Sequence, residues 1–168
     1  MFLDIGLGII IGLLISWIKL FEINWIFIFA GIIFALLPDL DYILMAIAKR
    51  SFKKGFLHHR EIFHRPLLYI PFGTLMCSLF SLPLAEIFAL ASFAHFLHDS
   101  IGIGWGVQWL YPFTKDHYSF FYIYKPQFRL KKLPQRLFYV WEDDEIEELD
   151  AEFGDLDWIR NIYFKWHP

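Results

Sequence analysis

Long apolar runs separated by short polar stretches dominate the first hundred residues of the chain. The runs cover residues 5–20, 25–37, 42–48, 66–82 and 84–97. A helix of about 20 apolar residues crosses the hydrocarbon core of a bilayer. The second run resumes after a brief polar interruption, so the pattern predicts four membrane-spanning helices rather than five.

The interruption of the second span is the sequence Pro38-Asp39-Leu40-Asp41. Ionised groups at membrane depth are costly and usually mark a functional site. In an unbroken helix Asp39 and Asp41 would point about 200° apart. Pro38 lacks a backbone N–H and breaks the helix, which could turn both carboxylates toward one site. The alternative is that they only cap a helix that begins near Pro38.

Histidines gather in two further places. Residues 58–65 read His-His-Arg-Glu-Ile-Phe-His-Arg, and the fourth predicted span ends in His95-Phe96-Leu97-His98-Asp99. On a helix His95 and Asp99 are four residues apart and share one face. A single such residue is more often a satisfied polar group, whereas a cluster at the end of an apolar helix favours a set of ligands.

Charge outside these motifs predicts the topology. Residues 49–65 carry six Lys or Arg against one Glu, and a second basic block follows the fourth span. Positive loops stay in the cytoplasm. Both termini are therefore expected inside, at a bacterial-type inner membrane, and all the candidate ligands are expected at its cytoplasmic face.

Composition agrees with a membrane protein. The chain is 57% hydrophobic with a mean hydropathy of +0.44, against about 45–50% apolar residues in soluble domains. Because no Lys or Arg precedes the first apolar run, we expect a retained helix rather than a cleaved signal peptide. Cys77 is the single cysteine, which excludes an internal disulfide and a Cys-rich zinc site.

The last third of the chain is polar. We expect an all-α membrane domain over residues 1–114 and a cytoplasmic tail over 115–168. Residues 100–114, rich in Gly and aromatics, are expected to form a re-entrant loop or an aromatic anchor. The basic and aromatic stretch that follows favours membrane lipids over nucleic acid. Residues 142–157 contain ten Asp or Glu and read as a solvated acidic tail.

The candidate ligands are imidazoles and carboxylates, namely Asp39, Asp41, His59, His64, His95 and Asp99. This set suits zinc first, and also manganese or iron. Six ligands exceed one tetrahedral site, so we expect one or two ions. Two ions can activate water and bind the oxygens of a phosphoester. Arg60 could hold a phosphate, and Glu61 is the candidate general base.

Three motifs in order resemble the YdjM-like family of predicted membrane-bound metal-dependent hydrolases. They are Leu37-Pro38-Asp39-Leu40-Asp41, His59-Arg60 with His64, and His95-x-x-x-Asp99, followed by a stretch that ends in Tyr111-Pro112. The resemblance covers roughly residues 1–114 and implies about four spans with a metal site.

The chain departs from the family pattern at four positions. Asp4 stands near the place of a His in the first helix, while Glu61, Phe63 and Arg65 replace the Gly, Thr and Ser of the histidine motif. Asp4 could still act as a ligand, because an inner N-terminus brings it to the same face. The other three changes bear on substrate handling and catalysis.

The sequence therefore predicts a metal-dependent hydrolase at the cytoplasmic face that acts on a phosphoester, with a lipid headgroup as one candidate substrate. The alternative is a non-catalytic membrane protein with a structural metal or polar cluster and a tail that recruits a partner. A metal-ion transporter is disfavoured, because the first and third spans lack charges after Asp4. Neither the substrate nor the oligomeric state follows from the sequence.

Overall fold

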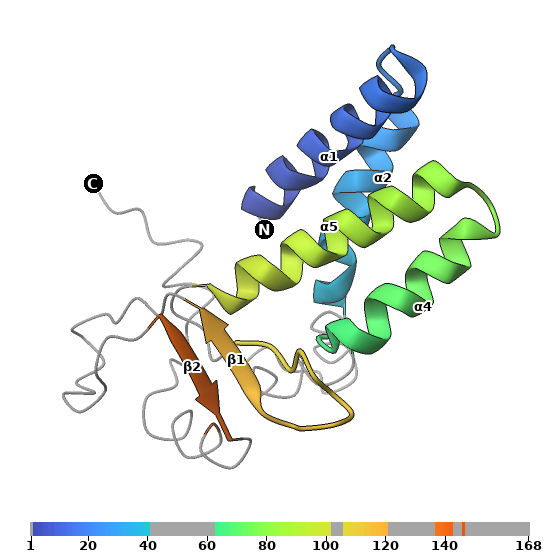
Figure 1. Ribbon diagram of the computed structural model, residues 1–168. Coiled ribbons are helices and arrows are strands. Elements are labelled where there is room, and N and C mark those ends of the chain that lie inside the picture. The colour runs from blue at the N-terminus through green and yellow to red at the C-terminus, as the bar shows by residue number, and fades with distance from the viewer. Residues whose placement is uncertain (1, 41–62, 102–105, 121–136, 143–145, 147–168) are drawn as a thin grey trace, which may run out of the picture.

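The computed structural model describes residues 2–40, 63–101, 106–120, 137–142 and 146. Within these ranges the chain forms four α-helices, one 3-10 helix and two strands (Figure 1). They are α1 (Phe2–Leu20), α2 (Trp25–Leu36), η1 (Leu37–Asp39), α4 (Pro66–Ser78), α5 (Leu82–Ser100), β1 (His117–Phe120) and β2 (Phe138–Trp141).

Helices α1 and α2 form a tight hairpin whose contact surface is made of glycine. A Cβ atom at Gly8 would lie 2.5 Å from the carbonyl oxygen of Gly31, and one at Gly12 would lie 2.5 Å from that of Phe27. Close packing through small residues therefore occurs at Gly8 and Gly12. It does not occur at Gly6, where a Cβ would have no neighbour within 4 Å.

Helix α5 is the central element, with α1 and α2 on one side and α4 on the other (Figure 1). Ile87, Ala91 and Phe96 on α5 are completely buried. Helix α4 runs antiparallel to α5 after a short turn, and Gly73 leaves room for the ring of Phe88 at their crossing. Phe88 also meets Phe34 of α2 edge to face, with ring centroids 5.1 Å apart, so one side chain joins three helices.

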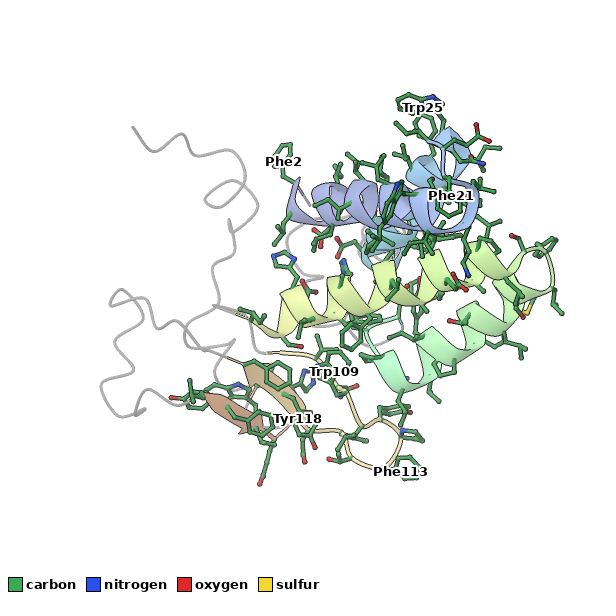
Figure 2. All side chains as sticks on the ribbon, turned by 45° about the horizontal axis from the view of Figure 1, so that its top comes forward. Phe2, Phe21, Trp25, Trp109, Phe113 and Tyr118 are labelled. Carbon is green, nitrogen blue, oxygen red and sulfur yellow. The ribbon has the colours of Figure 1, made fainter. Side chains whose placement is uncertain are left out.

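The outward faces of the bundle are apolar. Large exposed side chains include Ile10 and Trp17 on α1, Phe29 on α2, and Phe72 and Leu75 on α4. Apolar surface of this extent on a monomer marks contact with a membrane or another protein. Figure 2 shows Phe21 and Trp25 projecting at one end of the α1–α2 hairpin and Phe2 at the other end.

Among the described helices, α1 alone is both long and apolar enough to cross a bilayer. Its 19 residues correspond to about 28 Å at 1.5 Å per residue. Helices α2 and α4 have 12 and 13 residues, and their described parts are shorter than a full crossing requires. The four predicted helices are thus present, whereas four complete crossings remain a prediction.

The prediction of an all-α chain is wrong in one respect, because β1 and β2 form an antiparallel pair. His117 lies opposite Trp141, and Phe120 opposite Phe138. One face of the pair is buried, and there the indole N–H of Trp141 donates to the hydroxyl of Ser119 at 3.2 Å. Short strands rich in aromatics give little periodic signal in a single sequence, and their partners here lie about twenty residues apart.

The strand pair lies beside the C-terminal end of α5 (Figure 1). Trp109, in the segment between them, donates its indole N–H to the hydroxyl of Ser100 at 2.7 Å, and its ring packs edge to face on Phe93. The part of this segment around Trp109 therefore packs against α5 and does not stand apart from the bundle as a separate anchor would. The boundary between a membrane domain and a tail near residue 114 remains a prediction.

Candidate metal centre

Three segments of the chain bring four chemically active side chains to one end of the bundle. Asp39 ends the 3-10 turn that follows α2, His64 precedes the first residue of α4, and His95 and Asp99 occupy the last turns of α5. Short turns join α1 to α2 and α4 to α5, and the packing of these helices places the end of α2, the start of α4 and the end of α5 together. The predicted convergence is confirmed for these four residues.

The proline predicted to break the second span does so. Leu37–Asp39 form a 3-10 turn with Pro38 buried near its start. The turn ends the regular helix before Asp39, and the Asp39 carboxylate consequently reaches across to α5. His64 is placed by Pro66, which begins α4, a position where proline suits the first helical turn.

The four side chains form a group that could hold a metal ion. One ligand atom from each of Asp39, His64, His95 and Asp99 lies within 4.8 Å of the others. Nε2 of His64 is 3.2 Å from Oδ2 of Asp99 and 4.0 Å from Oδ1 of Asp39. Nε2 of His95 is 3.7 Å from each of the same two carboxylate oxygens.

These separations fit a shared cation. Ligand atoms about 2.0–2.1 Å from a tetrahedral ion lie about 3.3 Å from one another, and the four histidine–carboxylate pairs are separated by 3.2 to 4.0 Å. In addition, Nε2 of His95 is buried without a hydrogen-bond partner among the described residues. A buried polar atom left without a partner is costly, and a bound cation would satisfy Nε2.

The group is buried on one side and open on the other. The side chains of His64 and His95 are 1% exposed, whereas that of Asp99 is 18% and that of Asp39 is 41% exposed. The imidazole rings are packed from behind by Phe96, whose ring centroid lies 5.8 Å from that of His64 and 5.6 Å from that of His95. A ligand from solution would therefore approach past the two carboxylates.

A carboxylate outside this group contacts one of its members. Oδ1 of Asp4, on the first turn of α1, lies 3.4 Å from Nδ1 of His95 and 3.1 Å from Nδ1 of His98. The sequence indicated Asp4 as a candidate ligand, and the structure does bring it to the correct end. It places Asp4 against the far side of the His95 ring, however, rather than among the four grouped atoms.

A positively charged side chain follows His64 directly. The guanidinium carbon of Arg65 lies 3.8 Å above the centre of the Tyr111 ring, a cation–π contact. Sequence reasoning noted Arg65 as a departure from the family pattern but not this contact. The two residues touch in the fold but are 46 positions apart in the chain, so no local sequence pattern indicates their contact.

Several predicted site residues lie outside the described ranges. These are the candidate ligands Asp41 and His59 and the candidate catalytic residues Arg60 and Glu61. The choice between one ion and two depends on Asp41 and His59, so it remains a prediction.

Comparison with known proteins identifies the family to which the chain belongs. A model of the YdjM inner membrane protein family matches residues 3–147 of the chain. The match includes Asp4, the four grouped residues and both strands. No curated protein and no solved structure matches the chain.

Proposed function

The chain belongs to the YdjM inner membrane protein family, and from this premise we propose that it is a membrane-bound, metal-dependent hydrolase that acts on a phosphoester. The observation that carries the proposal is the group formed by Asp39, His64, His95 and Asp99, whose ligand atoms lie within 4.8 Å of one another. The apolar exterior of the helices supports placement of this group at the surface of a membrane.

The ligand types restrict the metal. Imidazole and carboxylate together suit zinc, manganese or iron, and zinc is the ion that we expect first. A divalent ion bound there would supply Lewis-acid activation of water and of a phosphoryl oxygen. The exposed carboxylates of Asp39 and Asp99 would leave one side accessible to substrate, as a catalytic site requires.

An anionic substrate is supported by Arg65. Its guanidinium is held over Tyr111, and its Nε is buried without a hydrogen-bond partner in the described part of the chain. Arg65 directly follows the candidate ligand His64 in the chain, and a fixed guanidinium is suited to binding phosphate. Arg60 and Glu61, from the same histidine motif, are proposed as the phosphate-binding residue and the general base.

The location of the site suggests the source of the substrate. We place both termini and the metal centre at the cytoplasmic face, because the basic residues in 49–65 lie between the second and third apolar helices. A site at that level would meet the headgroups of membrane lipids as well as soluble phosphoesters.

The second candidate is a structural metal in a non-catalytic membrane protein whose acidic tail recruits a partner. It is favoured by the fact that the four ligands come from three separate segments of the bundle, so that an ion would tie the helix ends together. A zinc ion with four protein ligands has no open position. This candidate predicts that metal removal destabilises the bundle and that no phosphoester is hydrolysed.

The first experiment measures metal content and phosphoester hydrolysis on detergent-purified protein. Wild type is compared with Asp39→Ala and His95→Ala, and with Glu86→Gln as a control. Glu86 forms an ion pair with Lys19 at 2.7 Å near the other end of α5, so its carboxylate lies outside the metal group.

We expect one or two ions per chain in wild type and in Glu86→Gln, and loss of metal in the two ligand variants. Hydrolysis of bis(p-nitrophenyl) phosphate or of a phospholipid headgroup should follow the metal content. Metal without hydrolysis of any substrate would support the structural alternative. A wild-type protein without metal would contradict both candidates.

A further inference from the structure

The first helix reaches the metal centre through a buried carboxylate. We propose that Asp4 is a positioning residue, which holds the imidazole of His95 so that its Nε2 faces the metal. This inference rests on the proposed metal site, but it is independent of whether the reaction is hydrolysis.

The two nitrogens of the His95 ring face different partners. Nδ1 lies 3.4 Å from Oδ1 of Asp4, whereas Nε2 lies 3.7 Å from the carboxylate oxygens of both Asp39 and Asp99. A neutral imidazole has one N–H and one lone pair. If Nδ1 carries the hydrogen and donates it to Asp4, Nε2 presents its lone pair to the shared centre.

The position of Asp4 differs from that of a ligand. Its carboxylate is not among the four grouped atoms, and it contacts the Nδ1 atoms of His95 and His98. A histidine bound to metal commonly donates its other N–H to a carboxylate, which fixes the ring and raises its basicity. Asp4 is placed as such a carboxylate, on the side of the His95 ring opposite Asp39 and Asp99.

Burial strengthens the contact between Asp4 and His95. Asp4 is 1% exposed and His95 is 1% exposed, so bulk water does not compete for either group. A buried carboxylate needs partners, and here the rings of His95 and His98 provide them. His98 is 36% exposed, so it covers Asp4 on the side that faces solvent.

The fold also fixes where Asp4 stands. Gly8, one helical turn further along α1, is in backbone contact with Gly31 of α2. This crossing leaves little freedom for α1 to slide or rotate. Asp4 is therefore held against α5 by the glycine contact as well as by its own hydrogen bond to His98 at 3.1 Å.

The test compares metal binding by wild type, Asp4→Asn, His98→Gln and His95→Ala in detergent. The dissociation constant for Zn²⁺ is measured by competition with a chromophoric chelator, and the visible spectrum of bound Co²⁺ reports the coordination. We expect Asp4→Asn to bind the same number of ions with a spectrum of the same type, but about 10–100-fold more weakly. His98→Gln, which leaves the Asp4–His95 contact in place, should lose less affinity.

Two outcomes would overturn the inference. One is a dissociation constant for Asp4→Asn within twofold of wild type. The other is complete loss of binding, with the Co²⁺ spectrum abolished as in His95→Ala, which would make Asp4 a ligand. If Asp4→Asn does not fold, Asp4→Ser replaces it and is judged by the same outcomes. Thermal unfolding of the metal-free proteins checks that the variants share one fold.

The failures of the two proposals can be told apart. Wild type that binds metal but hydrolyses nothing contradicts only the hydrolase. Wild type that binds metal and hydrolyses a phosphoester, with Asp4→Asn equal to it in affinity, contradicts only the role of Asp4. Wild type that binds no metal contradicts both.

Discussion

Two glycines in the same helix should respond to alanine in opposite directions. A Cβ at Gly12 would lie 2.5 Å from the carbonyl oxygen of Phe27 and 2.6 Å from the Cα of Ile28. These are backbone atoms, which cannot rotate away. Ordinary carbon contacts are about 3.5–4.0 Å, so Gly12→Ala must push α1 from α2 by about 1 Å. At Gly6 the same methyl group would meet nothing within 4 Å.

The magnitude follows from the two environments. Overpacking of this kind costs about 1–3 kcal/mol, whereas alanine in an open helical position is about 1 kcal/mol more favourable than glycine. For a chain of this size 1 kcal/mol corresponds to about 2–4 °C in the midpoint of unfolding. Gly12→Ala should therefore melt about 2–12 °C below wild type, and Gly6→Ala at the wild-type temperature or up to about 4 °C above it.

The assay is thermal unfolding of the three proteins in one detergent, followed by circular dichroism at the helical band. Zinc affinity is measured on the same samples. Because a displaced α1 carries Asp4 away from His95, Gly12→Ala should also bind zinc more weakly, while Gly6→Ala should not. Equal midpoints for the two variants would refute the assignment of the α1–α2 contact to Gly12.

Three further predictions concern the metal, one hydrogen bond and one ion pair. A chelator should lower the unfolding midpoint of wild type but not of His95→Ala, since an ion bound only to the folded state stabilises it; equal shifts would point to an effect unrelated to the site. Trp109→Phe keeps the aromatic packing but loses the bond to Ser100, and should cost about 1 kcal/mol in chemical unfolding; a cost near zero would mean that water replaces this bond. Lys19→Gln removes a pair that is about 40% exposed and should change stability by less than about 1 kcal/mol, so a midpoint more than about 4 °C lower would contradict a surface role.

Much of the site could be predicted from the sequence, for a physical reason. The four predicted spans have helical length, and successive crossings of a membrane alternate in direction. Asp39, His64, His95 and Asp99 each stand at a helix end that this alternation places on one side. Pro38 was also informative, because a proline at the end of an apolar run removes a helical hydrogen bond and favours a break in the helix there.

The partners of individual side chains could not be predicted in the same way. The contact between Asp4 and His95 joins residues 91 positions apart, and it depends on how far α1 is rotated against α5. That rotation is set by the approach of Gly8 to Gly31. The glycines were visible in the sequence, but the residues that they would meet were not.

The pairing of β1 with β2 could not be predicted from the sequence either. His117–Phe120 and Phe138–Trp141 are four residues each, too short for alternation to separate a strand from a polar aromatic loop. Their pairing gains its stability from burial beside α5. That burial is a property of the assembled chain.

The sequence by itself determined the class of protein, the number and order of the apolar helices and the end of the bundle at which the ligands meet. These follow from composition, length and alternation, which are local or cumulative properties. The tertiary structure alone decided that Asp4 lies behind His95 rather than beside Asp39, that Arg65 rests on Tyr111, and that β1 and β2 pair. Each of these is a contact between distant segments, and its geometry depends on how closely the helices pack.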